Sequence, residues 1–307
     1  MERETAFRIW CKIALFFALA MLFSSVFWVL TPKNSGDQLM LITGLMYCPA
    51  LAAFAVKALY KENIRDLGWQ WGKGKYQLWS YLIPLLYSLP VYLLAWSGGF
   101  GHFHYSAHVK IRQMLGLSGG SPAVILALYF LLNASFGMVA KVSRGLGEEI
   151  GWRGFLVPEL YKVTGFTGTS VISGLMWAAW HYPMIIFSNY HGSTPLLYSL
   201  GCFTVLAVAS SFLMAWLRLR SGSLWTGAVF HGSHNLFIQS IFTPLTEDNG
   251  ITGYLTDEFG IGMALSSALF AVLWCKYLPF GKTADGKERP VTGSSIPAGA
   301  ATAGRQA

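Results

Sequence analysis

Eight apolar runs occupy most of this 307-residue chain and restrict the folds that it can adopt. A helix needs about 20 apolar residues to cross a bilayer, and each run is close to that length. Hydrophobic residues make up 54% of the chain and charged residues only 12%, which excludes a soluble globule. The runs lack the period-2 alternation of strands, so we predict an all-α, polytopic transmembrane bundle of about eight spans. Their approximate limits are 7–31, 39–60, 78–96, 122–146, 169–188, 196–217, 223–242 and 259–279.

The distribution of Lys and Arg predicts the orientation of these spans. With the N-terminus inside, only Lys33, Lys110 and Arg112 of the 22 basic residues fall in outer loops. Such a bias is the positive-inside pattern, so both termini are expected to be cytoplasmic. The net charge of +8 then reflects inner loops and anionic lipid rather than nucleic acid. In this scheme one outer loop is acidic, with Glu247, Asp248, Asp257 and Glu258.

The chain divides into four expected parts. Residues 1–120 form N-terminal transmembrane helices and loops, and residues 121–245 form a core that carries the polar motifs described below. Residues 246–282 contain the last transmembrane helix. Residues 283–307 are rich in Gly, Ala, Ser, Thr and Pro and are expected to be a flexible cytoplasmic tail.

Two adjacent carboxylates lie at the inner end of the fourth run. On a helix Glu148 and Glu149 point about 100° apart, so they serve different roles. Glu149 and Arg153 are spaced i,i+4, which favours an ion pair. Glu148 is then free to face a cavity, where apolar surroundings favour its use as a general base. A solvated charge cluster at the membrane boundary is the alternative.

The fifth and seventh runs carry buried histidines. His181 lies one helical turn after Trp177, and His231 lies one turn before Asn235. Donors such as His231 and Asn235 suit an oxyanion hole in a dry site, expected here in neutral form. His234 points elsewhere on the helix and is expected to be structural. Each residue alone also fits a polar contact between helices.

Together, these groups are expected to meet. Alternating span directions bring Glu148, His181 and His231 to the inner half of the membrane. We therefore predict that they share one water-filled cavity open to the cytoplasm. A Gly-rich outer loop with His102, His104 and His108 also has spacing that suits a metal, although a solvated loop is the simpler interpretation.

In these motifs the sequence resembles the CAAX-protease and bacteriocin-processing family of intramembrane proteases, called CPBP or Abi. The matching motifs cover about residues 120–240 and occur in the family's order. The chain has Trp177 where the family commonly has Phe, a conservative change. The motifs are Glu148-Glu149-x-x-x-Arg153, Trp177-x-x-x-His181 and His231-x-x-x-Asn235.

The resemblance implies an intramembrane endopeptidase. Glu148 and His181 would activate water, His231 and Asn235 would stabilise the oxyanion, and the pair Glu149–Arg153 would give structural support. The family is described as glutamate-dependent and as metal-dependent. Without a His-Glu-x-x-His motif we favour the metal-free mechanism with no cofactor, although Glu148, His181 and His231 could bind zinc.

The expected partners are a membrane-associated protein or peptide substrate and the lipid bilayer, with no nucleic acid. The expected location is a bacterial plasma membrane, as a multi-pass protein. Peptide maturation, protein quality control and bacteriocin self-immunity all remain open as roles.

Two other functions remain as alternatives. Gly116-x-Ser118-Gly119 matches the Gly-x-Ser-Gly of rhomboid-type serine proteases, but the histidine signature of a later rhomboid span is not visible. We interpret this match as chance. A non-catalytic membrane scaffold or a bacteriocin self-immunity protein of the CPBP family is the second alternative, and a transporter could also carry buried Glu and His.

Overall fold

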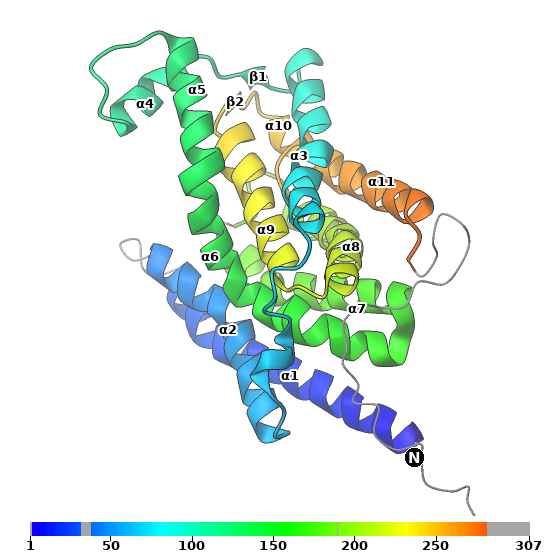
Figure 1. Cartoon of the computed structure of the whole chain (residues 1–307). Helices are drawn as coiled ribbons and strands as arrows, with labels where there is room; N and C mark the ends of the chain where they lie inside the picture. The colour runs from blue at the N-terminus through cyan, green and yellow to red at the C-terminus, as the bar shows by residue number, and fades with distance from the viewer. Residues whose placement is uncertain (1, 32–37, 189, 281–307) are drawn as a thin grey trace, which may run out of the picture.

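The computed structural model describes residues 2–31, 38–188 and 190–280, and nearly all of this part is helical (Figure 1). The first long helices are α1 (Glu2–Leu30), α2 (Gln38–Leu59) and α3 (Gly74–Ser97). The middle of the chain forms α5 (Pro122–Leu132), α6 (Met138–Glu149), α7 (Val157–Phe187) and α8 (Leu196–Ser221). The last helices are α9 (Trp225–His234) and α11 (Ile261–Tyr277). Shorter elements are η2 (Ile64–Leu67), α4 (Ala107–Met114), α10 (Thr252–Leu255) and the two-residue strands β1 (His102–Phe103) and β2 (Thr246–Glu247).

The predicted fold class, a helical membrane bundle, is confirmed. Each of the eight apolar runs falls on a helix. Within the described ranges, five helical stretches are long and apolar enough to cross a membrane. One of them, 122–187, covers two predicted runs, and the last apolar helix, α11, is shorter at 17 residues. The span count therefore agrees approximately with the prediction.

The connection between the fourth and fifth runs is helical rather than an open loop. Between α6 and α7 the chain forms a π-helical segment, η4 (Ile150–Leu156). The direction changes further on at Gly165, where φ is 68° and ψ is −176°. Glycine adopts such a positive φ without the penalty that a Cβ imposes. The two halves of this stretch can therefore pack separately.

Two distant loops meet at one end of the bundle. β1 and β2 pair antiparallel, with His102 opposite Glu247 and Phe103 opposite Thr246. Asn249 Nδ2 also donates to the Gly99 carbonyl at 2.8 Å. The sequence predicts that both loops lie on the outer side. In the structure they lie at the same end of the bundle, near the top of Figure 1.

Segments predicted to lie inside also contact one another. The Lys12 ammonium lies 2.6 Å from Glu62 and 2.8 Å from Glu159, which joins α1, the loop after α2 and α7. Gly68, in the loop before α3, accepts from the Leu224 backbone N–H at 2.8 Å. The predicted inner and outer segments therefore form two separate groups, while the membrane side of each group stays a prediction.

Small residues bring α2 against the segment that carries the paired carboxylates. A Cβ on Gly151 would lie 2.6 Å from the Pro49 carbonyl oxygen, and one on Gly147 would lie 2.6 Å from the Tyr47 ring. Gly147 and Gly151 form a Gly-x-x-x-Gly face, which lets helix backbones approach closely in membranes. This approach fixes the position of Glu148 and Glu149, which lie between the two glycines.

Candidate active site

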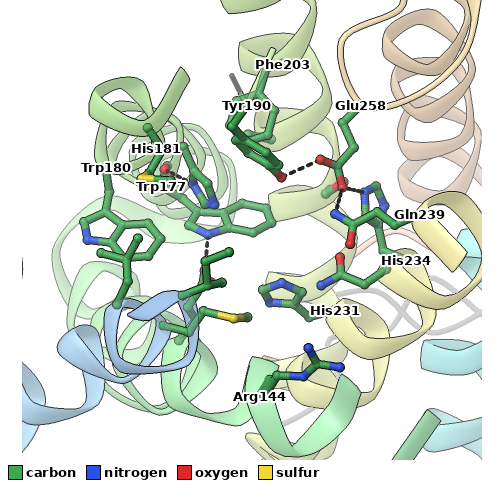
Figure 2. A pocket seen from close by; sticks show the side chains of 18 of the residues that line it. Arg144, Trp177, Trp180, His181, Tyr190, Phe203, His231, His234, Gln239 and Glu258 are labelled. Carbon is green, nitrogen blue, oxygen red and sulfur yellow. Dashed lines mark hydrogen bonds and ion pairs between the residues drawn. The ribbon is translucent and has the colours of Figure 1, made fainter. Parts of the chain in front are cut away.

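All four predicted catalytic residues line one cavity of about 280 Å³. They come from three separate helical segments: Glu148 from α6, His181 from α7, and His231 with Asn235 from the α9–η5 stretch. Figure 2 shows His181 and His231 on opposite sides of the Trp177 ring. These residues are up to 87 positions apart in the sequence, and the packing of the helices brings them to one cavity. Apolar side chains complete much of the lining, including Leu45, Met46, Met184, Phe203, Leu206 and Phe230.

Glu148 is held by one oxygen and open at the other. The residue is only 2% exposed, and its Oε2 accepts a hydrogen bond from Trp177 Nε1 at 2.8 Å. Among the described residues, Oε1 has no hydrogen-bond partner. This arrangement leaves one carboxylate oxygen available for a water molecule.

The contact made by His181 decides which ring nitrogen carries its proton. Nδ1 lies 2.9 Å from the Trp177 backbone carbonyl, an oxygen that can only accept. Nδ1 is therefore the donor, and in the neutral ring Nε2 presents a lone pair. Such a nitrogen can accept a hydrogen bond from water.

Trp177 contacts Glu148 and both histidines of the predicted site. Its ring centroid lies 5.5 Å from that of His181 and 5.8 Å from that of His231. The Arg153 guanidinium lies 4.5 Å from the same ring, in a cation–π contact. The hydrogen bond from Trp177 Nε1 to Glu148 gives Trp177 a role that Phe at the same position could not have.

Glu149 forms the predicted ion pair and a second contact that the sequence did not reveal. Its Oε1 lies 2.9 Å from Arg153 Nη1 and 3.1 Å from His231 Nδ1. Because His231 donates through Nδ1 to a carboxylate, its Nε2 is a donor only when the ring is protonated. In the neutral form that we expected, Nε2 would present an acceptor to the cavity rather than a donor. Asn235, one turn later, has an amide without a hydrogen-bond partner among the described residues.

Two residues outside the predicted catalytic set also line the cavity. Glu258 belongs to the predicted acidic outer loop, but its side chain is only 3% exposed and lines the cavity. His234 does not point away: it lines the same cavity, and its Nε2 donates to Glu258 Oε1 at 3.0 Å. Burial alone would raise the pKa of the Glu258 carboxyl, but the hydrogen bond and charge of His234 hold it below its ordinary value. The sequence signal for Glu258 was a carboxylate directly before an apolar run, which we assigned only to the acidic outer loop.

The described residues do not form a ready metal site. Among them, no group of three or more His, Cys, Asp or Glu side chains is placed to hold a metal ion. In particular, Glu148, His181 and His231 line one cavity but do not converge as a ligand set.

The remaining candidate residues lie away from the cavity. In the outer loop, His104 Nδ1 lies 3.7 Å from Glu247 rather than beside His102 or His108. Ser118 is exposed between α4 and α5 and does not line the cavity. Neither position shares the geometry of the Glu148 site.

A buried Glu and two His with an Asn, gathered from helices of a membrane bundle, define a membrane protein with an enclosed polar site. Comparison with known proteins narrows this class. Residues 121–237 match the family model of the type II CAAX prenyl endopeptidases, Rce1-like. That range includes Glu148, His181, His231 and Asn235, so the CPBP resemblance of this segment is confirmed.

One curated relative is CAAX prenyl protease 2 of the archaeon Methanococcus maripaludis. It is 24% identical to this chain over 206 residues, which cover 66% of this chain and 64% of the relative. The matched region thus spans less than two thirds of the relative's length.

Proposed function

We propose that this chain is an intramembrane endopeptidase that hydrolyses a peptide bond of a membrane-associated protein or peptide. The observation that carries the proposal is the gathering of Glu148, His181, His231 and Asn235 around one cavity. The family match over residues 121–237 and the name of the archaeal relative support the same class of reaction.

The proposed nucleophile is a water molecule between Glu148 and His181. The open Oε1 of Glu148 takes a proton from the water while Nε2 of His181 accepts its second hydrogen bond. The water oxygen bonds to the peptide carbonyl carbon and forms a tetrahedral intermediate. As the C–N bond breaks, the proton held by Glu148 passes through His181 Nε2 to the leaving nitrogen.

His231 and Asn235 are the proposed oxyanion donors. The Asn235 amide is free to donate, and a protonated His231 donates through Nε2 while Glu149 holds its Nδ1. Arg153 holds Glu149 in place through the 2.9 Å ion pair. Donors fixed before the reaction stabilise developing charge without reorganising, which is why such a pair accelerates the step.

The proposed orientation puts both termini in the cytoplasm. It rests on the near absence of Lys and Arg from the predicted outer loops. The contacts between loops support this arrangement. The strand pairing joins two predicted outer loops, whereas the Lys12 ion pair and the bond between Leu224 and Gly68 join predicted inner segments.

Peptide hydrolysis by the purified chain in lipid vesicles tests the function. The probe is an internally quenched peptide that ends in Cys-aliphatic-aliphatic-X, used with and without a farnesyl group on the cysteine. We expect the wild type to cleave at least one form and Glu148→Gln to lose most of that rate. Glu247→Gln, an exposed carboxylate at the bundle end, is the matched control and should cleave normally. Equal rates for Glu148→Gln and wild type would refute the assignment of the base.

A further inference from the structure

The cavity has a second polar wall that the proposed chemistry does not use. Glu258, in the loop before α11, is part of this wall. Its Oε1 accepts from His234 Nε2 at 3.0 Å and from Gln239 Nε2 at 2.7 Å, and its Oε2 accepts from the Tyr190 hydroxyl at 2.6 Å. Figure 2 shows these bonds converging on the carboxylate. With three protein donors, this carboxylate is better suited to hold structure than to bind a ligand.

The two donors to Oε1 reveal what is held. His234 and Gln239 are five residues apart, and in an α-helix such residues point about 140° away from each other. They can share one oxygen because η5 (Asn235–Phe242) is π-helical. In a π-helix the N–H bonds run from residue i+5 to residue i, which brings residues five apart close to one face. The Thr243 N–H donates to Ile238 in this pattern, at 2.9 Å.

Asn235 lies inside the turn that Glu258 spans. It follows His234 directly and is the first residue of η5. Because its amide has no hydrogen-bond partner among the described residues, its direction depends on the backbone of this turn. His234 is held on its other side as well, since the Tyr87 hydroxyl on α3 lies 2.5 Å from its Nδ1.

We propose that Glu258 is a positioning residue that clamps the π turn and thereby aims Asn235 into the cavity. The proposal rests on the proposed function, because it gives Asn235 its purpose as an oxyanion donor. Without the shared acceptor, the segment after His234 is free to wind as an ordinary α-helix, which turns Asn235 relative to His231. A donor used mainly in the transition state affects kcat when it is misplaced, and it affects substrate binding little.

A double-mutant cycle between positions 258 and 235 tests the clamp with the quenched peptide described above. Misplacement of a catalytic group by about 1 Å can cost about 10²-fold, so we expect Glu258→Ala to lower kcat by about 10- to 100-fold with KM nearly unchanged. Glu258→Gln keeps an oxygen acceptor at the same place and should restore most of the rate. In the Asn235→Ala background, Glu258→Ala should cost almost nothing more, because its only route of action is gone.

Other results overturn the clamp. An equal loss from Glu258→Ala in both backgrounds shows that Glu258 does not act through Asn235, and a rise in KM with unchanged kcat shows a role in binding. If Glu258→Ala does not fold, Gln239→Ala removes an exposed donor to the same oxygen and enters the same cycle. An Asn235→Ala variant with full activity would instead refute the oxyanion role, and with it the proposed function of this pair. Glu247→Gln is again the control for charge removal in this loop.

Discussion

At the scale of single residues, hydrogen-bond partners give this site its chemistry. The backbone carbonyl of Trp177 fixes the tautomer of His181, and Glu149 makes Nδ1 of His231 a hydrogen-bond donor. The Trp177 carbonyl lies one helical turn before His181, but the Glu149 partner of His231 does not follow from the helical spacing of the motifs. The same motif residues with other partners would present different nitrogens to the cavity.

Trp177→Phe should lower kcat, because it removes the N–H that holds Glu148 and keeps an aromatic ring between the histidines. A hydrogen bond to a charged group contributes about 1.5–3 kcal/mol, so a loss of about 10-fold or more is expected. Trp180→Phe is the matched control on the same helix, since its N–H bonds to Ser24 instead. Steady-state kinetics of both variants is the measurement, and equal losses would remove the special role of Trp177.

Arg153→Ala should reduce the amount of folded protein as well as the activity. The change leaves Glu149 buried without its ion-pair partner, and breaking a buried pair costs about 3–5 kcal/mol. Thermal unfolding in detergent, followed by tryptophan fluorescence, measures the loss. A variant as stable as the parent but inactive would move Arg153 from support into the catalytic group.

At the scale of elements, close helix contacts and π-helical segments aim the side chains. Both η4 and η5 follow directly after residues of the site, Glu149 and His234. π turns often occur at functional positions, where they rotate the residues that follow. Here η4 and η5 change the direction in which the side chains after Glu149 and His234 point.

Gly151→Ala should destabilise the packing of η4 on α2. The added Cβ would lie 2.6 Å from the Pro49 carbonyl oxygen, a backbone atom that cannot move away alone. Overpacking of this kind costs about 1–3 kcal/mol. Gly201→Ala on α8 is the matched control, because a Cβ there meets nothing within 4 Å and should be neutral or slightly stabilising. The midpoints of thermal unfolding compare the two, and equal midpoints would contradict the close-packing argument.

At the scale of the whole molecule, the described loops form two groups at opposite ends of a helical bundle. The strand pairing joins the predicted outer loops, and the Lys12 ion pairs join predicted inner segments. This grouping agrees with the loop assignment, while the direction relative to the membrane rests on basic residues alone.

Cysteine labelling in spheroplasts measures that direction. In a background without the four native cysteines, Asp248→Cys should react with an impermeant maleimide from outside, and Lys73→Cys should react only after the membrane is opened. Both positions are exposed in the structure, so burial does not protect them. Reaction of both positions from the same side would contradict the scheme.

A chelator separates the two proposed forms of catalysis. The metal-free mechanism that we propose predicts that peptide cleavage persists in the presence of a strong chelator. Loss of activity that returns on addition of zinc would favour the metal-dependent form, with Glu148, His181 and His231 as the ligands to test. Chelator-treated Glu247→Gln protein controls for effects on the exposed bundle end.

The sequence by itself determined the helical membrane fold, because apolar runs of bilayer length have one stable way to satisfy their backbone groups in lipid. It also singled out four residues that line one cavity, and it predicted the ion pair of Glu149 with Arg153 from their helical spacing. Tertiary structure alone decided that Glu149 reaches His231, that Trp177 holds Glu148, and that Glu258 belongs to the cavity. Those contacts join segments that are 29 or more positions apart, so they depend on how the helices pack and not on the pattern within any one of them.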